Sequence, residues 1–176
     1  MRKTTEKQRG DSRLSRPEAH FMHEVANTPR GKGVLACIQC GRCTSSCPVA
    51  RVVEEHNPRK LMEMIILGLH ADVLGEQLPW YCLSCFTCLD RCPQGGDVGE
   101  TMFAIRNLAV KEGRMPEGVR MQALSLYENG RVVAMGRMAS LQRAQYGLGE
   151  EPKVDVEAVQ RILRKTGFHK LVRKTK

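Results

Sequence analysis

Eight cysteines, which are all the cysteines of this 176-residue chain, form two runs with the same spacing. We call these runs box 1 (residues 37–48) and box 2 (residues 82–93); both read C-x2-C-x2-C-x3-C-P. This is the ligand pattern of a pair of [4Fe–4S] clusters. The first three cysteines of such a run can hold one face of a cubane cluster in a tight loop, whereas the fourth points away.

The fourth cysteine of each box is predicted to bind the cluster held by the other box, because this exchange is common in proteins with two such clusters. It would tie together two segments about 45 residues apart, so the clusters are expected to stabilise the fold. The assigned ligands are Cys37, Cys40, Cys43 and Cys92 for the first cluster, and Cys82, Cys85, Cys88 and Cys47 for the second.

Structural zinc and disulfide bonds are the two alternative uses of eight cysteines. Zinc sites usually take two separated C-x2-C pairs or add histidines at metal spacing, whereas each box has a third cysteine in the same turn. Disulfides would imply a secreted chain, yet residues 1–33 contain no apolar segment of signal-peptide length. The pattern therefore favours iron–sulfur clusters in a reducing compartment, which predicts a cytoplasmic protein.

Four thiolates on each cluster would leave no iron open to a substrate. We therefore expect the clusters to pass electrons, and we predict no catalytic residue. Neighbouring residues can tune a cluster through hydrogen bonds to sulfur, burial and charge. The expected neighbours are Gly41, which lets backbone N–H groups approach sulfur, Phe86 as apolar cover, Trp80 as a water shield or a loop anchor, and the two closing prolines Pro48 and Pro93.

Arg42 and Arg91 lie next to ligand cysteines inside the boxes. Either they raise the cluster potentials by favouring the more negative reduced state, or they form salt bridges pointing outward, and the sequence favours neither. The five histidines show no mutual metal spacing. For these histidines we expect surface or capping roles.

The net charge of +9 is concentrated in the tails. Residues 1–33 hold eight basic and four acidic side chains, and residues 161–176 hold seven basic side chains and no acidic one. The segment between them, residues 34–160, holds thirteen basic and fifteen acidic side chains. Without interleaved aromatic residues to stack on bases, such tails predict no nucleic-acid binding. The longest apolar run, residues 64–69, is far shorter than the roughly twenty residues of a membrane span.

The sequence predicts an all-α fold with two [4Fe–4S] cluster-binding loops between helices. We divide it into a flexible basic arm (1–33), a dicluster domain (34–114), a helical extension packing on it or on a partner (115–167) and a basic tail (168–176). Cap residues and apolar spacing predict the helices. These cover residues 18–26, 58–67, 97–113, 116–127 closed by Asn129-Gly130, 137–145 and 155–167, with Asn57, Asp97 and Asp155 as caps. The second helix is expected to present a broad apolar surface, and the last to turn Ile162 inward with Val156, Val159 and Leu163. The residues of that apolar surface are Leu61, Met64, Ile65, Ile66, Leu67 and Leu69.

The segments CIQCGRCTSSCP, PWYCLSCFTCLDRCP and VGETMFAIRNLAVKEG together resemble the C-type iron–sulfur subunit of heterodisulfide reductase, over about residues 34–165. The resemblance rests on the Trp80-Tyr81-Cys82 and Ile105-Arg106-Asn107 segments as well as the boxes. It implies an α-helical ferredoxin that relays electrons between the flavin-containing subunit and the catalytic subunit of such a reductase, and it leaves room for higher-order assembly of that complex.

Two alternatives remain at this point. The cysteine boxes alone are shared with the iron–sulfur subunits of fumarate reductases and glycolate-oxidase-type complexes. A structural metal module with nucleic-acid-binding basic tails is the alternative of another class, and it predicts zinc or a redox-silent cluster.

Overall fold

The computed structural model describes residues 15–75, 77–133, 136–149 and 151–173. Every regular element in these ranges is a helix and none is a strand, which confirms the predicted all-α fold. The chain divides into two compact units, Met1–Leu108 and Ala109–Lys176. No helix within the described ranges is long and apolar enough to cross a membrane.

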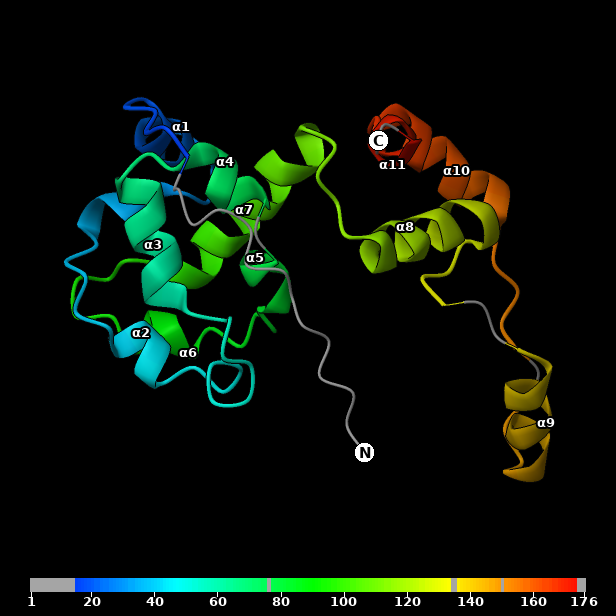
Figure 1. The fold of residues 1–176 in the computed structure, drawn as a ribbon. Helices are drawn as coiled ribbons and strands as arrows, with labels where there is room; N and C mark the ends of the chain where they lie inside the picture. The colour runs from blue at the N-terminus through cyan, green and yellow to red at the C-terminus, as the bar shows by residue number, and fades with distance from the viewer. Residues whose placement is uncertain (1–14, 76, 134–135, 150, 174–176) are drawn as a thin grey trace, which may run out of the picture. The chain divides into compact units, whose positions relative to one another are not determined.

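The first unit is built around α3 (Pro58–Ile66), the first of three helices described between the two boxes (Figure 1). This helix packs against α1 (Phe21–Ala26), the 3-10 helix η1 (Lys32–Ala36), α2 (Arg42–Ser45), α4 (His70–Gly75) and α5 (Leu78–Tyr81). The remaining helices of the unit are α6 (Thr87–Asp90) and the start of α7 (Val98–Lys111). The largest side chains buried completely or almost completely in this unit are Phe21, Leu61, Met62, Ile65, Met102 and Ile105.

Both long helices of this unit begin at the predicted caps. The Asn57 side chain accepts a 3.0 Å hydrogen bond from Lys60 N, and a proline occupies the first position of α3. The Asp97 side chain accepts a 2.9 Å bond from Glu100 N at the start of α7. These side chains satisfy N–H groups that have no partner within the helix, so each helix starts at a defined residue.

The apolar surface predicted for α3 is wrong at the C-terminal end of the helix. Ile66 and Leu67 are 36% and 53% exposed, whereas Met62, which we did not assign to this surface, is fully buried. A nine-residue helix presents only one face to the core, and Met62 falls on that face with Leu61 and Ile65.

Residues 15–33 of the predicted arm are folded onto this unit. Phe21 and Val25 of α1 are fully buried, and Glu18 N donates a 2.8 Å hydrogen bond to Gly68 O. Further along, a Cβ atom on Gly33 would lie 2.4 Å from Asp97 N. Glycine is therefore required where η1 approaches the start of α7, a contact that brings the segment before box 1 next to the segment after box 2.

The second unit contains α8 (Glu117–Asn129), α9 (Arg137–Gln145), α10 (Val156–Lys165) and α11 (Phe168–Arg173). Helix α8 packs against α10 and α11. The predicted Asp155 cap accepts a 2.9 Å bond from Ala158 N, but Ile162, which we expected to face inward, is 61% exposed. Helix α11 lies in the segment predicted as a basic tail, where buried Val172 gives the helix an apolar contact.

Candidate metal centre

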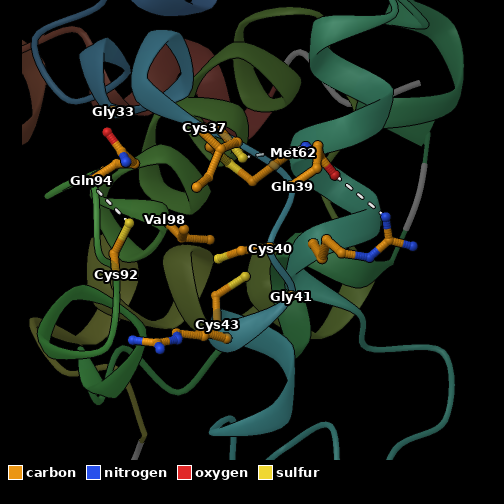
Figure 2. Close-up of a pocket in the computed structure, with 14 residues that line it drawn as sticks. Gly33, Cys37, Gln39, Cys40, Gly41, Cys43, Met62, Cys92, Gln94 and Val98 are labelled. Atoms are coloured by element: carbon orange, nitrogen blue, oxygen red, sulfur yellow. Dashed lines mark hydrogen bonds between the residues drawn. The ribbon is translucent and has the colours of Figure 1, made fainter.

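Four cysteines from both boxes surround one cavity beside α3 (Figure 2). Three come from box 1, at Cys37, Cys40 and Cys43, and the fourth is Cys92 at the end of box 2. The cavity has about 380 Å³ of space outside the protein atoms, and we call it cavity 1. Its other lining residues are Gly33, Ile38, Gln39, Gly41, Arg42, Arg59, Met62, Gln94, Gly96 and Val98.

A second cavity, cavity 2, is bordered by the remaining four cysteines. Box 2 supplies three of them and box 1 supplies Cys47. Cavity 2 has about 400 Å³ of such space, nearly the same as cavity 1, as expected for two copies of one ligand pattern. Four thiols around each cavity fit the donor set of a [4Fe–4S] cluster. Its remaining lining residues are Val49, His56, Pro58, Leu83, Phe86, Thr87, Val98, Gly99 and Met102.

The two boxes fold into loops with the same unusual backbone. Gln39 and Ser84 occupy equivalent positions and have φ angles of 59° and 57°. Gly41 and Phe86 are also equivalent, with φ angles of 80° and 58°. Left-handed residues in such loops turn neighbouring N–H groups toward one side, which makes a concave surface suited to anions. Phe86 was expected only to cover a cluster, and its positive φ is a feature that the sequence did not reveal.

Several hydrogen-bond donors point at cysteine sulfurs. Gly96 N lies 3.2 Å from Cys92 Sγ, and Ser84 N lies 3.4 Å from Cys82 Sγ. The Gln39 side-chain amide lies 3.3 Å from Cys37 Sγ. Donors aimed at sulfur stabilise negative charge on a thiolate ligand and raise the potential of a bound cluster.

The thiols differ in how readily they ionise. Burial raises the pKa of Cys43, and it raises the pKa of Cys88 to about 11 with help from negative charge on Cys82 and Cys43. By contrast, a hydrogen bond with Thr87 lowers the pKa of exposed Cys85. Because thiolates are the metal ligands, binding must release protons from the buried thiols.

Comparison with known proteins identifies the family. Residues 33–96 match a family described as a 4Fe-4S dicluster domain. The chain is 35% identical over 145 residues to the iron–sulfur C subunit of the CoB–CoM heterodisulfide reductase of Methanopyrus kandleri, covering 79% of this chain and 75% of that one. It is 35% identical over 124 residues to the C subunit of the ferredoxin:CoB–CoM heterodisulfide reductase of Methanosarcina mazei, covering 70% and 75%.

The chain belongs to the heterodisulfide reductase C-subunit family. A heterodisulfide reductase C-subunit-like protein of Archaeoglobus profundus extends the similarity to 93% of this chain and 87% of that one, at 35% identity. The resemblance predicted from the sequence is confirmed, and it supports an iron–sulfur subunit that transfers electrons.

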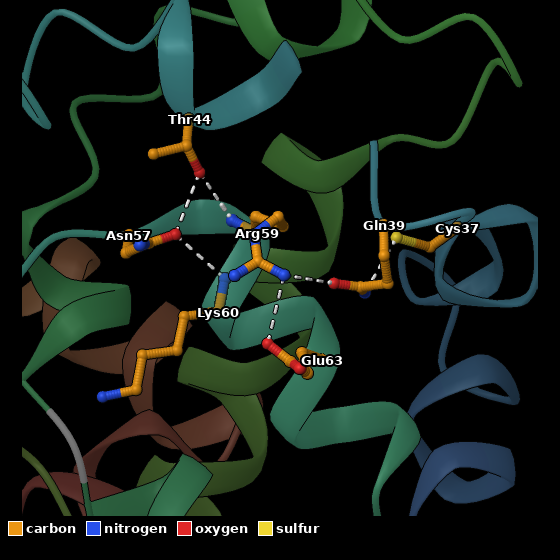
Figure 3. A network of polar contacts seen from close by, with 7 residues as sticks. All are labelled: Cys37, Gln39, Thr44, Asn57, Arg59, Lys60 and Glu63. Carbon is orange, nitrogen blue, oxygen red and sulfur yellow. Dashed lines mark hydrogen bonds and ion pairs between the residues drawn. The ribbon is translucent and has the colours of Figure 1, made fainter. Parts of the chain in front are cut away.

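A charged network supports cavity 1 of this heterodisulfide reductase C-family protein (Figure 3). The guanidinium of Arg59 lies 3.3 Å from Glu63 Oε2 and 3.5 Å from Gln39 Oε1, and the Gln39 amide in turn reaches Cys37 Sγ. Arg59 N also donates a 2.9 Å bond to the Thr44 hydroxyl of α2. Arg59 therefore orients the side chain that donates to a cysteine and places a positive charge in the cavity wall. No motif in the sequence marks Arg59 as part of the site.

None of the described residues that line cavity 2 is an Asp, Glu, Lys or Arg. Phe86 stacks on Phe103 with ring centroids 6.3 Å apart, and Met102 is buried beside it. His56 is buried too, and its Nδ1 lies 3.0 Å from Leu78 O. The expected surface or capping role is therefore wrong for this histidine, because tertiary packing encloses it. Burial lowers the pKa of His56, with a smaller contribution from the positive charge of Arg106, so the neutral ring is favoured.

Arg106 of α7 anchors the segment that leads into box 2. Its Nε donates a 2.8 Å hydrogen bond to Pro79 O and its Nη2 a 2.5 Å bond to Cys82 O. The same guanidinium lies 5.8 Å from the centre of the Trp80 ring. Trp80 is half-buried and is not among the residues lining either cavity, which favours its role as a loop anchor over that of a water shield. The two prolines that close the boxes, Pro48 and Pro93, are exposed and line neither cavity.

Proposed function

We propose that this chain carries two [4Fe–4S] clusters and passes electrons within a heterodisulfide-reductase-like complex, between its flavin-containing subunit and its catalytic subunit, which handles a disulfide or other sulfur substrate. We call these two partners the flavin subunit and the catalytic subunit. The observation that supports the proposal most is the grouping of the cysteines. Each cavity is bordered by three cysteines of one box and the last cysteine of the other.

The ligand sets follow from that grouping. Cys37, Cys40, Cys43 and Cys92 would hold the first cluster, and Cys82, Cys85, Cys88 and Cys47 the second. A [4Fe–4S] cluster supplies one-electron chemistry with little change of geometry. The chain contributes thiolates, N–H donors to sulfur and a wall that limits water access. These groups set the reduction potential of the cluster.

Both cavities reach the protein surface, which an electron relay requires. Cys40 borders cavity 1 and Cys85 borders cavity 2, and both side chains are exposed. Partners docking at these edges would approach one cluster each. Val98 lines both cavities, so the two clusters would be neighbours. This arrangement supports entry of an electron at one cluster and exit at the other.

The experiment that tests the relay is reconstitution with the flavin and catalytic subunits from the same organism, prepared anaerobically. The reduced flavin subunit is mixed with the catalytic subunit, with and without this chain, and reduction of the catalytic subunit is followed by stopped-flow spectroscopy. We expect the chain's clusters to bleach first and the catalytic subunit to be reduced only when the chain is present. Reduction at the same rate without the chain, or clusters that stay oxidised throughout, would rule out the relay.

A further inference from the structure

Three arginines line an open hollow at α2 and α6. These two helices pack against each other (Figure 1). We call it the arginine hollow. It has about 990 Å³ of space outside the protein atoms, more than either cysteine cavity. Among the described residues no Asp or Glu lines the hollow. Its lining residues are Arg42, Ser45, Ser46, Arg51, Thr87 and Arg91.

The arginine hollow borders both cluster cavities. Arg42 also lines cavity 1, and Thr87 also lines cavity 2. These two residues are equivalent in the two boxes, as are Ser46 and Arg91. Each box therefore supplies one arginine, and the two arginines occupy positions that are not equivalent in the two boxes. The packing of α2 on α6 brings both arginines to the same hollow.

The positive charges of the hollow are not neutralised within the chain. Arg42, Arg51 and Arg91 are exposed, and in the described part of the chain none of them forms an ion pair. The first unit as a whole carries little net charge: residues 1–108 hold fourteen basic and twelve acidic side chains. Each oxidised cluster with its thiolates would add about −2. The hollow is thus a local basic surface on a unit whose net charge would be about −2 with both clusters bound.

We propose that the arginine hollow docks an acidic surface of the protein that exchanges electrons with these clusters, which rests on the two-cluster relay proposed above. Arginine pairs with carboxylates through two parallel hydrogen bonds, and uncompensated arginines at an interface are common anchors. Three arginines with no acidic side chain among the described lining residues favour an acidic partner surface at the hollow.

A protein surface suits this hollow better than a free anion. All three arginines are exposed, so a small anion held there would remain hydrated and would bind weakly. Val52, next to Arg51, is 84% exposed and offers the apolar contact that a protein interface uses and a free anion does not. Docking here places a partner beside both clusters, because the walls of the hollow and of the two cavities share residues.

The test compares charge reversal inside the hollow with the same change outside it. Arg51→Glu is chosen because Arg51 is not adjacent to a cysteine, and Lys60→Glu is the control because Lys60 is exposed and lies outside the hollow. Binding of the full-length holoprotein to the purified flavin subunit, and separately to the purified catalytic subunit, is measured by anaerobic calorimetry, at low and high sodium chloride and with added sulfate. Iron is quantified in the same samples.

We expect Arg51→Glu to weaken binding to one of the two partners about tenfold or more and to reduce its salt dependence, with Lys60→Glu within about twofold of wild type. Equal effects of the two variants would overturn the proposal. Tight sulfate binding that depends on Arg51, with partner binding unchanged, would also overturn it and identify a small-anion site. Because binding and iron content are read separately, loss of clusters in the wild type would count against the relay and not against the docking surface.

Discussion

The guanidinium of Arg106 donates a 2.5 Å hydrogen bond to the backbone carbonyl of Cys82, although the two residues are 24 positions apart in the chain. Together with the bond to Pro79 O, this contact joins α7 to the first cysteine of box 2. The loop that presents three cysteines to cavity 2 is thus held by a side chain of the following long helix, in addition to any metal it binds.

Arg106→Lys is expected to destabilise box 2, because lysine cannot donate to both carbonyl groups in the same geometry. Loss of charged hydrogen bonds should cost about 1–3 kcal/mol of unfolding free energy. Iron release to a chelator should accelerate at the second cluster. Arg120→Lys on α8, which replaces the arginine of an exposed ion pair, is the control and should leave both measurements unchanged. Equal behaviour of the two variants would mean that Arg106 does not anchor the box.

The crossed ligation predicts which cluster each fourth cysteine supports. Cys47→Ser should alter the same EPR signal as Cys85→Ser, because both residues border cavity 2. Cys92→Ser should instead alter the same signal as Cys40→Ser, since both border cavity 1. If Cys47→Ser reproduced the Cys40→Ser spectrum, each box would bind its own cluster and the assignment would fail.

Arg59 and Glu63 are expected to shift the potential of the first cluster in opposite directions. Arg59→Met removes a positive charge from the wall of cavity 1 and should lower the midpoint potential, whereas Glu63→Gln removes its negative partner and should raise it. Both side chains are partly exposed, so solvent screening limits each effect to roughly 1 kcal/mol, about 40 mV for one electron.

An EPR-monitored redox titration reads this shift. Lys60→Met is the control, because Lys60 adjoins Arg59 in sequence but is exposed and lies outside the cavity wall. It should leave both midpoint potentials in place. Shifts of the same sign for the Arg59 and Glu63 variants would show that structural disturbance, and not charge, had moved the potential.

His56 predicts a pH dependence of stability. Its pKa in the folded protein is lowered from the ordinary 6.5 by burial, so below that value the unfolded chain binds more protons than the folded one. Stability should therefore fall as the pH drops below about 6.5 and be restored on return to neutral pH. His56→Asn retains an N–H donor for Leu78 O and removes the titration, so its urea-unfolding midpoint should depend less on pH. Identical pH profiles for the two proteins would exclude His56 as the cause.

Local signals in the sequence predicted the longer helices well. Asn57, Asp97 and Asp155 each accept a backbone N–H at the start of a helix, and Gly130 follows α8 with a φ of 68°. These interactions connect residues three or four positions apart, so their residue types are sufficient to identify them. The cysteine boxes could be recognised in the same way as the helix caps, because the spacing of their cysteines alone indicates a cluster-binding loop.

Features that depend on distant segments could not be predicted in this way. Helix α5 has only four residues, and the sequence around Trp80 contains no periodicity that would reveal it. The burial of His56 depends on packing, including its contact with the carbonyl of Leu78, 22 positions away. Arg106 appeared in the sequence only as part of a family-like segment, and its role became visible once α7 was placed beside box 2.

The most direct test of the two-cluster assignment is anaerobic iron and sulfide analysis of the purified chain, combined with EPR of the dithionite-reduced protein. Two [4Fe–4S] clusters predict about eight iron and eight sulfide per chain, with interacting S = 1/2 signals from neighbouring reduced clusters. Stoichiometric zinc, or a single cluster that dithionite does not reduce, would contradict it.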